Sequence, residues 1–302
     1  MIRFFLLLYF LFISVLSYAQ DQTPIASFPF QSDVFYQNKI QDLKTQYSQN
    51  LNIKLLDSII SIAFSYKDWE TSIVYSQKAI EINASAQRYF LLGGAAGFRA
   101  LEVPMLSSLK YVNIMKPAFR AAARLEPSNV RYLRAQVDVL VALPPLLGGS
   151  ITDAQEYVNK IQDLNLLEGL MAEGSLHEKT ENLEGAKKVF KQVFSYLTQT
   201  YAYCTDTFID DLKSNRRDLA YDLGRIAADY NLNVQWGQCA LSYFEETHGF
   251  RDTVPIAWVY YQKARLAKKA ENQEEMNLLI TKAQAYQKDF PALENLLNQL
   301  KS

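Results

Sequence analysis

The sequence has 302 residues, of which 49% are hydrophobic, and it is nearly neutral, with 31 Lys and Arg against 32 Asp and Glu. Nucleic acids and anionic membranes attract basic surfaces, so this charge balance argues against both as the main partner. The length and the absence of a Pro-, Gly- or Ser-rich linker favour one elongated domain over two globular ones.

Residues 1–19 have the features of a cleaved signal peptide. Arg3 supplies a positive start, Phe4 to Leu16 is an apolar run, and Ser17-Tyr18-Ala19 provides small residues for cleavage. The run is too short to span a bilayer comfortably, although a retained N-terminal anchor is the alternative. A lipid anchor is disfavoured because no cysteine lies near the cleavage site. We therefore predict export to the periplasm, with an extracellular location as the alternative.

Residues 20–32 contain two prolines and no helical period, which predicts an extended lead-in. From residue 33 onward, apolar residues recur every three or four positions, and no segment alternates for long enough to predict a strand. The sequence thus predicts a single all-α domain over residues 33–302.

Successive segments of this domain share a 34-residue pattern of two helices. The clearest copy is Leu167 to Thr200, where Gly174 holds the position of close helix contact and Ala186, Phe190 and Val193 point inward. The predicted units are 53–86, about 87–127, 130 to about 165, 167–200, one around Gly224 after an insertion near 205–215, and roughly 257–291. Gly94 is predicted to hold the small position of the second unit, and 292–300 should form a capping helix.

This period and pattern resemble the tetratricopeptide repeat (TPR). The resemblance covers about four fifths of the chain and implies a right-handed α-solenoid of about six helical hairpins. TPR arrays are binding scaffolds, so it also implies a protein or peptide partner held on the concave face. It does not imply which partner.

The string LPPLLGGS, residues 143–150, interrupts the third unit. Pro144 and Pro145 should end the first helix, while Gly148 and Gly149 permit unusual backbone angles and Ser150 caps the next helix. Glycines before a helix can also bind an anion, but no Walker lysine follows and no strand precedes. We therefore expect a structural loop.

The same string is similar to one in a group of exported bacterial TPR proteins. The matching residues are Pro144, Pro145, Leu146, Leu147, Gly148, Gly149 and Ala154. This group includes the periplasmic TPR component of tripartite TRAP-type transporters. The resemblance implies an alternative function as a solute-binding or transport accessory protein, which would bring a small-molecule ligand.

We expect neither catalysis nor a cofactor. His177 and His248 each lack a second His or Cys at metal-ligand spacing, and no nucleophile motif or dinucleotide fingerprint is present. Cys204 and Cys239 could form a disulfide, but spacing alone cannot show proximity, and two free core cysteines is the preferred interpretation.

First helices line the concave face of a TPR array, and their inward positions here carry many arginines and aromatics. Arginine binds carboxylates through two parallel hydrogen bonds, which makes an acidic or carboxylate-bearing peptide a candidate ligand. An ordinary solvated or ion-paired groove is the alternative. The candidate groove residues are Arg88, Arg131, Arg134, Tyr221, Arg225, Trp258, Tyr261 and Arg265.

Overall fold

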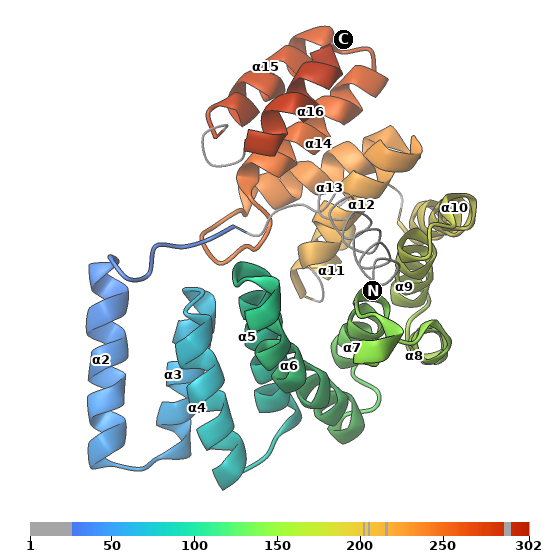
Figure 1. The fold of residues 1–302 in the computed structure, drawn as a ribbon. Coiled ribbons are helices and arrows are strands. Elements are labelled where there is room, and N and C mark those ends of the chain that lie inside the picture. Colours follow the sequence, from blue (N-terminus) through green and yellow to red (C-terminus); the bar gives the residue numbers. More distant parts are fainter. Residues whose placement is uncertain (1–25, 202, 205, 215–216, 287–290, 302) are drawn as a thin grey trace, which may run out of the picture. The chain divides into compact units, whose positions relative to one another are not determined.

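The computed structural model describes residues 26–201, 203–204, 206–214, 217–286 and 291–301. Within these ranges the chain forms fifteen α-helices and one short 3-10 helix, and it contains no β-strand (Figure 1). The predicted all-α class is therefore confirmed. The predicted signal peptide lies outside the described residues, as do residues 20–25 of the lead-in. None of the described helices combines the length and the apolar composition that crossing a bilayer requires.

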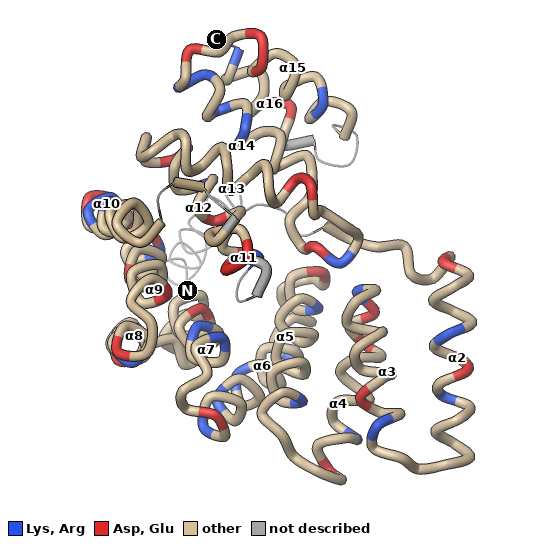
Figure 2. Tube along the Cα trace, turned by 180° about the vertical axis from the view of Figure 1, so that it is seen from behind, with Lys and Arg blue, Asp and Glu red and all other residues tan. Residues whose placement is uncertain are grey.

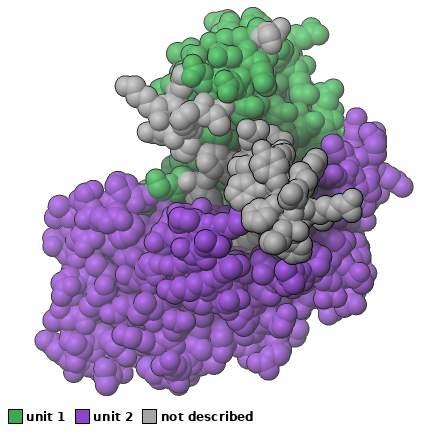
Figure 3. All heavy atoms as spheres, in the orientation of Figure 1, with its two compact units in different colours: residues 1–27, 198–302 green, residues 28–197 purple. Residues whose placement is uncertain are grey.

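The chain divides into two compact units, which Figure 3 colours separately. Unit 2 contains residues 28–197, and unit 1 contains residues 198–302 together with the N-terminal residues up to 27. The boundary falls near the end of one helix, α10 (Leu183–Thr200). The single domain expected over residues 33–302 stays a prediction.

Unit 2 consists of an N-terminal helix followed by four helical hairpins. Helix α2 (Val34–Gln49) comes first, and its Tyr36 is fully buried against the first hairpin, where its hydroxyl donates to Asp68 Oδ2 at 2.6 Å. The hairpins are α3 (Ile53–Ser65) with α4 (Trp69–Ile82), α5 (Ala86–Glu102) with α6 (Met105–Leu125), α7 (Val130–Ala142) with α8 (Ile151–Leu164), and α9 (Leu166–Lys179) with α10. The four repeat units predicted in this region all form hairpins.

Unit 1 holds the two remaining hairpins and the cap. The predicted insertion contains a helix, α11 (Asp206–Ser214), and the hairpins are α12 (Arg217–Tyr230) with α13 (Val234–Glu246) and α14 (Ile256–Lys269) with α15 (Gln273–Gln284). The last helix, α16 (Pro291–Lys301), contacts both α14 and α15 and buries Leu293 and Leu297 completely. This is the capping helix that the apolar end of a helical stack requires.

Four of the six hairpins turn through a residue other than glycine in the left-handed backbone conformation, although only glycine adopts positive φ without steric cost. These residues are Lys67, Glu181, Asn231 and Glu271, with φ between 53° and 61°. The turns of the other two hairpins contain proline: Pro104 precedes α6, and Pro144-Pro145 follow α7, where Gly148 is also left-handed.

Glycines allow two of the hairpins to close tightly. A Cβ at Gly174 would lie 2.1 Å from Phe190 of the partner helix, and one at Gly224 would lie 2.1 Å from Leu241. In the second unit the equivalent contact belongs to Gly93, where a Cβ would meet the Phe119 ring at 2.8 Å. The expected residue, Gly94, faces Phe64 of the preceding hairpin instead, so that prediction was wrong by one position.

The LPPLLGGS string forms the loop that the sequence predicts. Helix α7 ends at Ala142, η1 (Pro145–Leu147) follows, and Gly148 has a φ of 89°. Ser150 caps α8 by accepting a hydrogen bond from the Asp153 N–H. The N–H groups of residues 147–149 donate to the Pro144 and Pro145 carbonyls, and that of Ser150 donates to the Leu140 carbonyl of α7, so they are already occupied and do not form an anion cradle.

Cys204 and Cys239 form a disulfide, with their Cα atoms 6.2 Å apart. The preferred interpretation of two free cysteines was therefore wrong. The error has a physical cause, because 35 residues separate the two cysteines and only the path of the chain through α11 and α12 brings them together. The bridge ties the segment after α10 to the middle of α13.

Candidate functional site

The eight candidate groove residues lie in both units. Arg88 on α5 and Arg131 and Arg134 on α7 belong to unit 2, whereas Tyr221, Arg225, Trp258, Tyr261 and Arg265 on α12 and α14 belong to unit 1. Acidic and basic residues are interspersed over most helices, but α6 and α14 carry only basic residues and α13 carries only acidic ones (Figure 2).

In unit 1, two of the candidate aromatics are core residues. Tyr221 and Trp258 retain only 5% and 6% of their accessible surface. Tyr221 packs against the Phe244 ring at 5.7 Å between centroids. Most of each ring therefore stabilises the hairpins and leaves little surface for a ligand.

The two arginines of unit 1 converge on one carboxylate. Arg225 and Arg265 both form ion pairs with Asp229, the first through Nη1 at 2.9 Å. Arg265 also donates to Gln262 Oε1 at 2.8 Å and lies over the Tyr261 ring at 5.5 Å. A ligand carboxylate would have to displace these contacts, so this cluster is a structural tie between α12 and α14.

Arg88 is occupied in the same way. Its guanidinium forms two parallel hydrogen bonds, both 2.8 Å long, to the Asp57 carboxylate of α3, and it also donates to the Asn83 carbonyl. The hydrogen bond to Asp57 raises the pKa of the Arg88 side chain, and burial only partly opposes that effect. This pair joins the first helices of adjacent hairpins.

Arg131 and Arg134 differ from the other three candidate arginines in having no carboxylate partner among the described residues. Arg131 is exposed, and its guanidinium carbon lies 5.3 Å from the centre of the Phe90 ring. Arg134 makes one long hydrogen bond, 3.5 Å, to the Glu168 carbonyl. Residues three apart share a face of a helix, so α7 presents two guanidinium groups with unused donors side by side.

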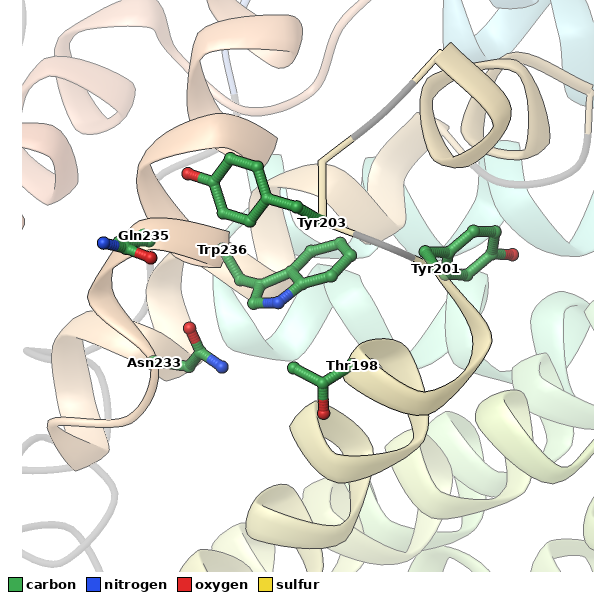
Figure 4. A pocket seen from close by; sticks show the side chains of 6 residues that line it. All are labelled: Thr198, Tyr201, Tyr203, Asn233, Gln235 and Trp236. Carbon is green, nitrogen blue, oxygen red and sulfur yellow. The ribbon is translucent and has the colours of Figure 1, made fainter.

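A second feature, absent from the sequence predictions, is a small cavity in unit 1 (Figure 4). Its volume is about 180 Å³, and none of the residues that line it is charged. They come from the end of α10, the segment that follows it and the start of α13, and they are Thr198, Tyr201, Tyr203, Asn233, Gln235 and Trp236. No sequence pattern predicts this cavity, because the segment after α10 has no repeat pattern.

Neither histidine belongs to a cluster of metal ligands in the described part of the chain, where no group of three or more His, Cys, Asp or Glu residues could hold a metal. The His177 ring lies 3.1 Å from the Asn182 amide in the turn after α9. The His248 ring lies 2.9 Å from the Val254 carbonyl. Both rings therefore make local contacts in turns.

Comparison with known proteins identifies a structural relative. The chain is similar to a tetratricopeptide repeat protein from Parabacteroides merdae ATCC 43184, whose crystal structure it matches with a TM-score of 0.51. The match covers 87% of this chain and 91% of the other, at 12% sequence identity. The fold is an α-solenoid of TPR-like hairpins. No family model matches the sequence, and no curated protein matches it either.

Proposed function

We propose that this protein is a non-catalytic scaffold that binds a protein or peptide partner through α7. The observation that carries the proposal is the pair Arg131 and Arg134, which lies on the first helix of a TPR-like hairpin without a carboxylate partner in the described residues. The fold supports the same class of function, because stacked hairpins offer an extended binding surface.

The preferred ligand group is a carboxylate. Arginine presents a planar fork of donors that matches the two carboxylate oxygens, and a pair of such forks one turn apart suits an acidic side chain or a chain terminus. Phe90, under the Arg131 guanidinium, adds an apolar surface beside the charges. Asp138, one turn beyond Arg134 on α7, forms no ion pair with it and limits the net positive charge of this face.

We also propose that the protein is exported. The predicted signal peptide at residues 1–19 is one reason, and the Cys204–Cys239 disulfide is a second, since disulfides persist in oxidising compartments such as the periplasm. We do not extend the proposal to a transport accessory role. That alternative rests on the LPPLLGGS string, which here forms a loop whose N–H groups at residues 147–150 are bonded to backbone carbonyls.

The peptide-binding proposal can be tested with a fluorescein-labelled hexaglutamate peptide and its hexaglutamine counterpart. At low salt we expect saturable binding of hexaglutamate by the full chain, followed by fluorescence anisotropy. The double variant Arg131→Ala/Arg134→Ala should bind about tenfold or more weakly, because each guanidinium contributes to a charge-assisted contact. Added salt should reduce binding by the wild type, since the contacts are electrostatic.

A matched control is Arg120→Ala/Arg124→Ala, which removes two exposed arginines from α6, the second helix of the preceding hairpin. It changes the net charge of the chain equally and should leave binding near the wild-type value. Equal losses in the two double variants would show a general charge effect and would contradict a site on α7. So would equal binding of hexaglutamine.

A further inference from the structure

The cavity of unit 1 is lined by one largely buried residue whose polar atom opens toward it, Trp236. Trp236 keeps only 2% of its accessible surface, and its ring packs edge-to-face against Phe208 at 4.8 Å between centroids. Its indole nitrogen faces the cavity in the space shared by Asn233 and Thr198 (Figure 4). It makes no hydrogen bond to any described residue. An indole N–H is a donor only, so an oxygen of a ligand in the cavity could accept a hydrogen bond from it.

Comparison with other helix starts indicates that Asn233 also has a polar group available to a ligand. Asn52, Asn129, Asn165 and Asn272 each stand before a helix and cap it by accepting a backbone N–H. Asn233 occupies the same position before α13, but it has a φ of 38° and its side chain makes no capping bond. Its amide instead faces the cavity beside the Trp236 nitrogen (Figure 4). The side-chain amide of Asn233, unlike those of the four capping asparagines, is thus available to a ligand.

The chemistry of the lining defines the class of ligand. Amide and hydroxyl groups donate and accept hydrogen bonds, as sugar hydroxyls do, and the rings of Tyr201, Tyr203 and Trp236 offer flat apolar surface. With no charged residue in the lining, an ionic ligand would lose hydration without a counter-charge. An apolar side chain would leave the Trp236 N–H and the amides without partners.

The volume of the cavity further limits the class of ligand. The cavity, at about 180 Å³, is smaller than the roughly 300–1,000 Å³ of sites for drug-sized ligands. Extended peptides bind along grooves or sheet edges, whereas only six residues line this opening. We infer that it binds a neutral polyhydroxylated ligand of one ring, either a free monosaccharide or the terminal residue of a longer saccharide.

The disulfide holds the two walls of this site together. Cys204 directly follows Tyr203, and Cys239 lies one helical turn after Gln235 on α13. Reduction would release the wall that carries Tyr201 and Tyr203 from the wall that carries Asn233 and Trp236. Saccharide binding should therefore depend on the oxidised state of the pair.

The test is a titration of the oxidised full chain with glucose, galactose, mannose and N-acetylglucosamine. Tryptophan fluorescence and saturation-transfer NMR would both report binding. We expect at least one sugar to bind saturably, and about fivefold weaker binding in Gln235→Ala and in Trp236→Phe, since each loses one neutral hydrogen bond. Gln235 is exposed, so its substitution leaves the core intact if the phenylalanine variant folds poorly. Gln238→Ala, on the same helix but outside the lining, should bind as the wild type does.

Further measurements distinguish a free sugar from the end of a saccharide chain, and a sugar from an amino acid ligand. Tighter binding of a disaccharide than of its terminal monosaccharide would assign the site to the end of a saccharide chain, and equal binding would assign it to a free sugar. Dithiothreitol should weaken binding without changing the far-ultraviolet circular dichroism. The inference would be overturned if no sugar bound saturably, if Gln235→Ala bound as well as the wild type, or if N-acetyl amino acid amides bound in preference to sugars. None of these outcomes depends on Arg131 and Arg134.

Discussion

At the scale of single residues, the contact between Gly174 and Phe190 shows how one missing side chain sets the spacing of a hairpin. Phe190 is fully buried, and its ring fills the space that a Cβ on residue 174 would need. Glycine costs about 1 kcal/mol relative to alanine inside a helix, so the packing must return more than that. The benefit lies in the close approach of α9 and α10.

We expect Gly174→Ala to lower the midpoint of thermal unfolding, despite the better helix propensity of alanine. The added Cβ would lie 2.1 Å from Phe190 Cε1, and overpacking of this kind typically costs about 1–3 kcal/mol. Gly94→Ala is the matched comparison, because its Cβ would lie 3.2 Å from the nearest atom, on Phe64. A Gly174→Ala protein as stable as wild type, or more stable, would refute the packing argument.

The candidate arginines show which properties of the site could not be predicted from the sequence. The inward positions on first helices could be read from the repeat pattern, but their ion-pair partners could not. Asp57 lies 31 residues before Arg88, and Asp229 lies 36 before Arg265, on neighbouring hairpins. Only the packed structure shows that these two arginines are paired and that Arg131 and Arg134 have no carboxylate partner in the described residues.

At the scale of elements, Glu245 connects three helices of unit 1. It lies on α13, its Oε2 accepts from Lys263 of α14 at 2.6 Å, and its Oε1 lies 3.5 Å from Lys282 of α15. Burial on its own raises the pKa of the Glu245 carboxyl, but the hydrogen bond and charge of Lys263, with a contribution from Lys282, outweigh it and hold the pKa below its usual range.

The lowered pKa of Glu245 determines how its contribution to the free energy of unfolding changes with pH. A carboxyl whose pKa is lowered by folding stabilises the folded state above its ordinary pKa, and this contribution is lost as pH falls through the lowered value. We expect Glu245→Gln to reduce the free energy of unfolding by about 1 kcal/mol at pH 7. The difference from wild type should shrink below about pH 4, where the carboxyl becomes protonated.

Chemical denaturation of both proteins across this pH range measures the effect. Glu246→Gln is the control, because it changes the charge equally at the next, exposed position. A constant difference between Glu245→Gln and wild type from pH 7 to pH 3 would show that the ion pairs do not contribute.

At the scale of the whole molecule, the 34-residue period was enough to predict six hairpins, because each repeat buries its apolar residues at fixed helical spacing against the next. The LPPLLGGS loop and the C-terminal cap also followed from local rules on proline, glycine and amphipathic helices. The disulfide and the cavity did not, since both depend on bringing the segment after α10 beside α13.

The central claim is that this scaffold binds a partner protein through α7. Photo-crosslinking in the cell of origin tests it most directly, with a photoreactive amino acid in place of Asp138, one helical turn from Arg134 on an exposed position of α7. The account predicts a discrete covalent adduct in the cell envelope fraction, strongly reduced when Arg131 and Arg134 are also replaced by alanine. An adduct of undiminished yield in that double variant, or no protein adduct at all, would contradict the claim.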